Sequence, residues 1–130
     1  MRERLQAELR LIEAEYGDIE IGPNAEWFII KRWALPAGWN KTETAVLVLV
    51  PSGYPVTPPD NFYVDDDLRV AGTNQPPGNA SPGQVQAGKP WLQFSHHVEA
   101  GDWQPHPNIL EGHNLLTFLI GVRQRLVEVN

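Results

Sequence analysis

The sequence predicts an α+β fold, in which two helices pack against an antiparallel meander sheet of three to four strands. Segments near both ends of the chain carry apolar residues at helical spacing. The segments between them are rich in β-branched and aromatic residues and are separated by Gly, Pro and Asn. With 130 residues, of which 42% are hydrophobic, the chain is predicted to form a single domain over residues 1–130.

Residues 2–16 are predicted to form an amphipathic helix that ends at Gly17. Its apolar face carries Leu5, Leu9, Ile12 and Tyr16. Strands are predicted at residues 26–35 and 42–50, with a hairpin loop over residues 36–40 between them.

Residues 51–59 contain four prolines. Because proline has no backbone N–H to donate, this segment is predicted to be neither a helix nor a central strand. A short strand is predicted at residues 61–64. Residues 71–90 are dominated by Gly, Pro, Asn, Ser and Gln, which predicts a long flexible loop.

A buried C-terminal helix is predicted from Asn114 to Val129 because Leu115, Leu119, Val122 and Leu126 form one apolar stripe along it.

The candidate reactive site is Ser95-His96-His97, flanked by aromatic residues in a chain that has no cysteine. A serine hydroxyl needs an adjacent base to act as a nucleophile, and imidazole suits that role. In extended backbone Ser95 and His97 share a face, so His97 is the preferred base. His96 is then expected to be structural or to bind a partner, although a turn would exchange the two histidines. A carboxylate that orients the imidazole is expected from Glu99 or Asp102.

A histidine metal site is the alternative chemistry, since His96, His97, His106 and His113 lie close in sequence. Adjacent histidines point apart in regular structure, however, and no cysteine ligand exists. We therefore expect neither a metal nor another cofactor. A third interpretation is that His96 and His97 are an ordinary pair of surface histidines with no chemical role.

The formal charge of -6 argues against nucleic acid and anionic membranes as partners. The first residues alternate in charge and contain no apolar signal-peptide region. The longest apolar run, residues 45–50, is too short to cross a bilayer. We therefore expect a cytoplasmic protein.

Two motifs give the chain a resemblance to the ubiquitin-conjugating (UBC) family. Gly53-Tyr54-Pro55-Val56-Thr57-Pro58-Pro59 resembles the Tyr-Pro-x-x-Pro-Pro turn between the second and third strands of that family. Trp103-Gln104-Pro105 resembles the Trp-x-Pro that follows its active-site segment, and the helix from Asn114 matches the family's next helix. The lack of cysteine and the Phe-Ser-His-His segment are most similar to the prokaryotic family E branch of the UBC-like superfamily.

The resemblance implies a function and a site. The family's catalytic cysteine commonly lies eight positions before that Trp, which is the position of Ser95 here. The family's His-Pro-Asn motif is absent before Ser95, and Asn108 follows the Trp, so the role of that Asn is not assigned to it. The implied function is to accept a ubiquitin-like modifier from a ThiF-type activating enzyme, as a serine oxyester, with a JAB-type peptidase as a further partner. The alternative is an inactive UBC variant that binds a modifier or partner protein as an adaptor.

Two partner-binding regions are expected. In the family the first helix docks the activating enzyme, which here implicates Arg2, Arg4 and Arg10, although a solvated face of mixed charge is the simpler explanation of these residues. Trp39 is placed at a hairpin tip, where it is expected to be exposed and to contact a partner. The other tryptophans are expected in the core.

Overall fold

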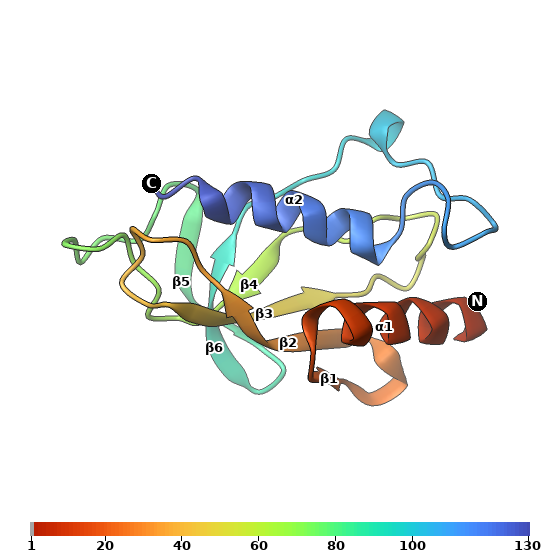
Figure 1. The fold of residues 1–130 in the computed structure, drawn as a ribbon, viewed down its shortest axis with the longest axis horizontal. Helices are drawn as coiled ribbons and strands as arrows, with labels where there is room; N and C mark the ends of the chain where they lie inside the picture. Colours follow the sequence, from red (N-terminus) through yellow and green to blue (C-terminus); the bar gives the residue numbers. More distant parts are fainter. Residues whose placement is uncertain (1) are drawn as a thin grey trace.

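The computed structural model describes residues 2–130 and has the expected α+β architecture, in which a helix near each end of the chain packs on an antiparallel sheet (Figure 1). The helices and strands, in chain order, are α1 Arg2–Tyr16, β1 Ile19–Ile21, β2 Trp27–Ala34, β3 Glu43–Leu49, β4 Phe62–Val64, β5 Ala80–Gln86, β6 Lys89–Phe94 and α2 Leu115–Val127. Two single 3-10 turns occur at Pro23–Ala25 and Ala100–Asp102. None of the helices over residues 2–130 combines the length and apolar character needed to span a membrane.

The predicted helices and the three predicted strands are confirmed. Gly17, with a φ of 87°, ends α1, and its N–H donates to the carbonyl of Glu13. Asn114 caps α2 through a capping box with Thr117. The start of α2 is therefore fixed by side chains that the sequence places at the expected positions.

The sheet has six strands, in the order β1-β2-β3-β4-β6-β5, instead of three to four. Three strands, β1, β5 and β6, were not predicted, and the flexible loop predicted over residues 71–90 is wrong from Ala80 onward. β5 and β6 form a hairpin closed by Ala87 and Gly88, which both have a positive φ. β5 is polar and interrupted by a bulge near Gly83, so its strand structure depends on pairing with β6 rather than on its own residue preferences.

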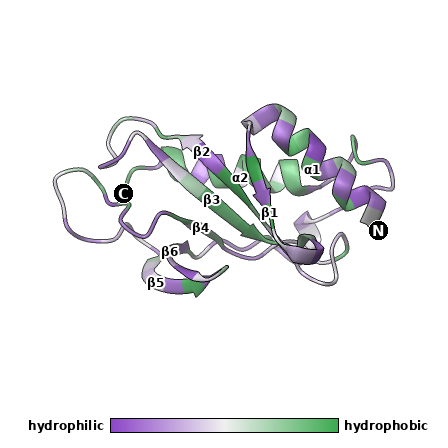
Figure 2. Ribbon diagram, turned by 90° about the horizontal axis from the view of Figure 1, so that it is seen from below, coloured by the Kyte–Doolittle hydropathy of each residue, from purple (hydrophilic) through white to green (hydrophobic). Residues whose placement is uncertain are grey.

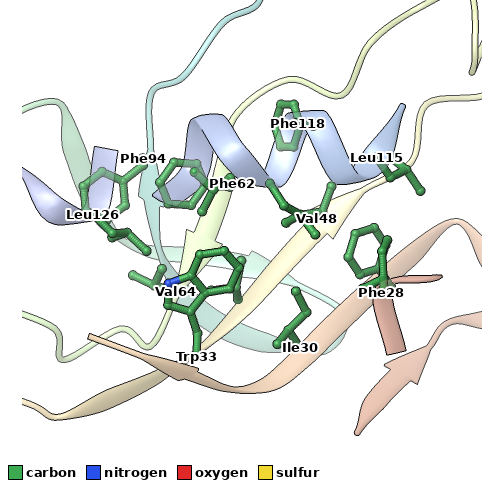
Figure 3. Packing of buried hydrophobic residues seen from close by; sticks show 14 of the residues in the cluster. Phe28, Ile30, Trp33, Val48, Phe62, Val64, Phe94, Leu115, Phe118 and Leu126 are labelled. Atoms are coloured by element: carbon green, nitrogen blue, oxygen red, sulfur yellow. The ribbon is translucent and has the colours of Figure 1, made fainter. Parts of the chain in front are cut away.

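The main core lies between the helices and one face of the sheet. Figure 3 shows Phe62 and Phe94 from the strands beside Leu126 of α2, and Phe118 of the same helix belongs to the same cluster. A smaller cluster covers the other face of the sheet and consists of Ile29, Leu47, Tyr63 and Trp91. In Figure 2, β3 is largely hydrophobic, as expected for a central strand that buries both faces.

A buried carboxylate joins both helices to the proline-rich turn of residues 51–59. Glu8 of α1 is fully buried and pairs with Arg4 at 2.8 Å. It also accepts a hydrogen bond from the hydroxyl of Tyr54 and one of 2.8 Å from the N–H of Leu115, the first residue of α2. Burial, together with the neighbouring Glu8, raises the pKa of Tyr54 above its usual range. The hydroxyl therefore stays protonated and remains a donor.

Candidate functional site

Ser95 directly follows β6 and is exposed, while Phe94 before it is fully buried. The ring of Phe94 stacks on that of Phe62, with centroids 4.9 Å apart. The N–H of Ser95 donates to the carbonyl of Asn79 at 2.8 Å. The hydroxyl at position 95 is thus presented at the surface from a backbone that is anchored on both sides.

His97 lies on the same face as Ser95, with its Nε2 3.3 Å from Ser95 Oγ. On the other side of the ring, Nδ1 lies 2.5 Å from Oδ1 of Asp60. Because a carboxylate only accepts hydrogen bonds, Nδ1 carries the proton and Nε2 is left to accept from the hydroxyl. Ser95, His97 and Asp60 therefore have the connectivity of a nucleophile, a base and an orienting acid.

The orienting carboxylate is Asp60, rather than Glu99 or Asp102 as the sequence suggested. Asp60 ends the proline-rich turn before β4, and β4 pairs with β6 through Phe62 and Phe94. The neighbouring residue Asn61 exchanges two hydrogen bonds with His96, since its N–H donates to the carbonyl of His96 at 2.7 Å and its Oδ1 accepts from the N–H of His96 at 3.1 Å. The antiparallel register therefore brings Asp60 beside His97.

All three side chains face solvent. The side chain of His97 is 62% exposed and that of Asp60 is 66% exposed. Water screens charges at such positions, so the pair of Asp60 and His97 contributes little to the free energy of unfolding. The contact with Asp60 instead fixes the tautomer and the orientation of the His97 imidazole.

His96 has the opposite environment. Its ring is half-buried and lies edge-on between Phe62 and Phe118, at centroid distances of 5.6 and 5.5 Å. Burial, reinforced by the neighbouring His97 and Arg125, lowers the pKa of His96. The ring also approaches α2 at Gly121, where a Cβ would lie 3.0 Å from Nε2 of His96. This histidine faces the core and is separated from the hydroxyl of Ser95.

The two motifs that carry the UBC resemblance contact each other. The indole N–H of Trp103 donates to the carbonyl of Pro55 at 2.7 Å, and the rings of Tyr54 and Trp103 lie 6.3 Å apart. The segment after β6 therefore returns across the proline-rich turn that precedes Asp60 (Figure 1).

The residues expected to bind partners differ in their surroundings. Arg4 is 13% exposed, pairs with Glu8 and donates to the carbonyls of His106 and His113, so it is held inside the fold rather than offered for docking. Arg10 is exposed on α1. Arg2 begins α1, but its side chain lies outside the described part of the structure.

The expected exposure of Trp39 is wrong. Trp39 is 6% exposed and its indole N–H donates to the carbonyl of Leu126 at 2.9 Å. The β2–β3 connection folds back onto the end of α2 and places the ring edge-on to Phe94. Trp39 is therefore a core residue rather than an exposed one.

The four histidines do not converge. Nδ1 of His106 accepts the N–H of Asn108, while Nδ1 of His113 accepts the N–H of Gln104. Within residues 2–130 no group of three or more His, Cys, Asp or Glu side chains is arranged to hold a metal ion. The histidines at 106 and 113 shape the loop that leads to α2.

The chain was compared with protein families, curated proteins and solved structures. The family model of "Prokaryotic E2 family E" matches residues 5–128. No curated protein matches the chain, and no solved structure does. Since the family match spans the whole sheet, α2, most of α1 and the segment around Ser95, the chain belongs to prokaryotic E2 family E.

Proposed function

We propose that this protein accepts a ubiquitin-like modifier from a ThiF-type activating enzyme and carries it as an oxyester on Ser95. Membership in an E2 family supports modifiers and activating enzymes as the general class of partner. The observation that carries the proposal is the exposed hydroxyl of Ser95, 3.3 Å from an imidazole that Asp60 orients. A JAB-type peptidase that removes the modifier from its targets completes the proposed set of partners.

The transfer has two steps. First, Oγ of Ser95 attacks the activated carbonyl carbon at the modifier's C-terminus while Nε2 of His97 takes the hydroxyl proton. The bond to the activating enzyme breaks, and its leaving group receives that proton. Second, an amine attacks the oxyester, and the proton that it loses returns through His97 to Oγ of Ser95.

An oxyester reacts more slowly with amines than a thioester does. Stabilisation of the tetrahedral oxyanion has to offset this difference, and one well-placed hydrogen-bond donor contributes roughly 3–4 kcal/mol. His96 is not proposed to react, because its ring faces Phe62 and Phe118.

The test is covalent loading. With cognate modifier, activating enzyme and ATP, the wild-type protein is expected to form an adduct that mild alkali or hydroxylamine releases. Ser95→Ala is expected to abolish it because no hydroxyl remains, whereas Ser95→Cys is expected to give an adduct that thiols release. Ser52→Ala, at another exposed serine, is the matched control. Persistence of the alkali-labile adduct in Ser95→Ala would place the nucleophile elsewhere.

The second candidate is an adaptor that binds a modifier or partner without covalent chemistry. The lack of cysteine and the solvent-exposed site favour it. A pulldown with modifier and activating enzyme separates the two candidates. An alkali-labile covalent band supports the carrier, whereas association that salt disrupts, with no such band, supports the adaptor.

We further propose that the activating enzyme docks on α1 beside Arg10. Arg10 and Glu13 border a groove between α1 and β1, with a volume of about 340 Å³, whose apolar walls include Leu5, Leu9 and Ile19. An apolar groove with a charged rim is typical of a surface that recognises another protein. Arg4 is excluded from this role by its contacts within the fold.

A further inference from the structure

We infer that Ser95, His97 and Asp60 form an esterase site that hydrolyses small activated esters with water as the acceptor. The inference uses the same hydroxyl as the proposed function but requires neither a modifier nor an activating enzyme. It rests on three observations: the two contacts of the His97 ring, the anchoring of Ser95, and the exposure of all three side chains.

The contacts of His97 are those that a hydrolytic base needs. Nδ1 is held by Oδ1 of Asp60 at 2.5 Å, so Nε2 is directed at the oxygen of Ser95 at 3.3 Å. A base within reach of the proton that it removes contributes roughly 10²–10⁴-fold to a rate, and apo structures commonly show this contact slightly long. Asp60 acts through His97 and is therefore a positioning residue.

The nucleophile is placed independently of the base. The N–H of Ser95 is bound to Asn79, and Phe94 before it is locked by stacking on Phe62. Asp60 is held in place through its neighbour Asn61, just before β4, because Asn61 makes two hydrogen bonds with the backbone of His96 after β6. Nucleophile and orienting acid thus lie on neighbouring strand ends whose register is set by the sheet, which reduces the cost of aligning them.

Exposure determines the acceptor and the class of substrate. Because water reaches all three side chains, it can occupy the position of the incoming nucleophile once Ser95 carries an acyl group. An exposed site also offers little apolar surface to hold an acyl chain. The substrates that fit are therefore small esters whose leaving group is a weak base, and the rate is expected to rise in proportion to substrate concentration.

The reaction balances without an oxidant or reductant. In acylation, the bond between Oγ of Ser95 and the acyl carbon forms and the bond to the leaving alkoxide breaks. The hydroxyl proton passes through Nε2 of His97 to that leaving group. In deacylation, water bonds to the acyl carbon, the bond to Oγ breaks, and a proton from water passes through His97 to Oγ. The products are a carboxylic acid and an alcohol.

The experiment is hydrolysis of p-nitrophenyl acetate by the full chain, without modifier or activating enzyme, combined with mass spectrometry of the peptide that contains Ser95. The wild type is expected to hydrolyse the ester and to carry a transient acetyl group on Ser95. Ser95→Ala and His97→Asn are each expected to lower kcat/KM by about 100-fold, the lower end of the range for a positioned base. These substitutions are at exposed positions and leave the core unchanged.

Two controls separate this site from the reactivity of ordinary surface groups. His106→Gln removes another exposed imidazole and is expected to leave kcat/KM unchanged. Asp60→Asn is expected to lower it by about tenfold, less than the loss at a buried acid, because water screens the exposed pair. Asp60→Glu is expected to restore part of the loss, and the NMR signal of the His97 Nδ1 proton should be lost in Asp60→Asn and regained in Asp60→Glu. A purely structural role for Asp60 would not move that signal.

Hydrolysis that is equal in wild type and Ser95→Ala, with no acetyl group on Ser95, would overturn the inference. If modifier still loads onto Ser95 in that case, the carrier function stands alone. If ester hydrolysis depends on Ser95 but no modifier adduct forms, the carrier function fails and the esterase remains.

Discussion

Two adjacent histidines of this protein have opposite surroundings because extended backbone sends successive side chains to opposite faces. His97 lies at the surface beside Ser95, whereas His96 lies between Phe62 and Phe118. Their different environments could be predicted from the sequence once the segment was taken as extended. The identity of the orienting acid could not, because Asp60 reaches His97 only through the pairing of β4 with β6.

The half-buried His96 is expected to make the stability of the fold depend on pH. The pKa of His96 in the folded protein is lowered, mainly by burial, from an unfolded value of about 6.5. Between those two values the unfolded chain binds a proton that the folded chain does not. The contribution of His96 to the free energy of unfolding is therefore fully present above about pH 6.5 and is lost as the pH falls toward the folded pKa.

His96→Gln is accordingly expected to flatten the decline in the free energy of unfolding as the pH falls below about 6.5, since glutamine does not titrate. Urea denaturation at a series of pH values gives the free energy of unfolding of the wild type and the variant. Plotted against pH, the two sets of values should run parallel above pH 7. An equally steep decline in the variant below pH 6.5 would show that other groups cause it.

At the scale of elements, α2 carries a glycine in its interior, where alanine would ordinarily stabilise a helix by roughly 1 kcal/mol. Gly121 lies where the ring of His96 meets the helix, and a Cβ there would be 3.0 Å from Nε2. The neighbours Phe62 and Phe118 restrict movement of that ring. The close approach of ring and backbone explains why glycine occupies this position.

Gly121→Ala is therefore expected to raise the free energy of unfolding by about 0.5–1 kcal/mol less in the wild type than in a His96→Ala background, where the ring is absent. A double-mutant cycle by urea denaturation measures this coupling. Gln124→Ala, at an exposed position of the same helix, serves as the control and should be additive with His96→Ala. Additivity at Gly121 would mean that the ring moves aside freely.

The hairpin of β5 and β6 illustrates what side-chain patterns leave undetermined. Pro82 and Gly83 are poor strand residues, and the composition of residues 71–90 is typical of a loop. Strand structure arises there because β6 is buried and supplies a pairing edge for β5. β6 was not predicted as a strand either, although its buried residues Trp91, Leu92 and Phe94 show that it lies inside the sheet.

At the scale of the whole molecule, fold class, both helices and three strands followed from hydrophobic periodicity and turn residues. Contacts between residues far apart in the sequence could not be predicted from these patterns. Trp39 lies 87 positions before Leu126 in sequence yet donates to its carbonyl, and Arg4 reaches the carbonyl of His106 across 102 positions. Such contacts depend on how the layers stack, so a tryptophan in a loop and an arginine on an amphipathic helix were both predicted to be freer than they are.

The proposed docking surface on α1 can be tested by charge. Arg10→Glu is expected to slow modifier loading by about tenfold, because a charge at the rim of an interface acts mainly on the association rate. The effect should shrink as salt concentration rises. Arg32→Glu, an exposed arginine of β2, is the matched control and should load normally. Loading is followed by the alkali-labile adduct, and equal rates for Arg10→Glu and wild type would exclude docking at this groove.

The tight turn at Ala87 and Gly88 is a suitable place to insert a label. It joins β5 to β6 at the end of β6 opposite Ser95, and at about 3.3 Å per residue the extended chain from Gly88 to Ser95 spans roughly 23 Å. Both residues of the turn are exposed. A fluorophore or short epitope inserted there would report on complexes with other proteins while leaving the hydroxyl of Ser95 and both helices untouched.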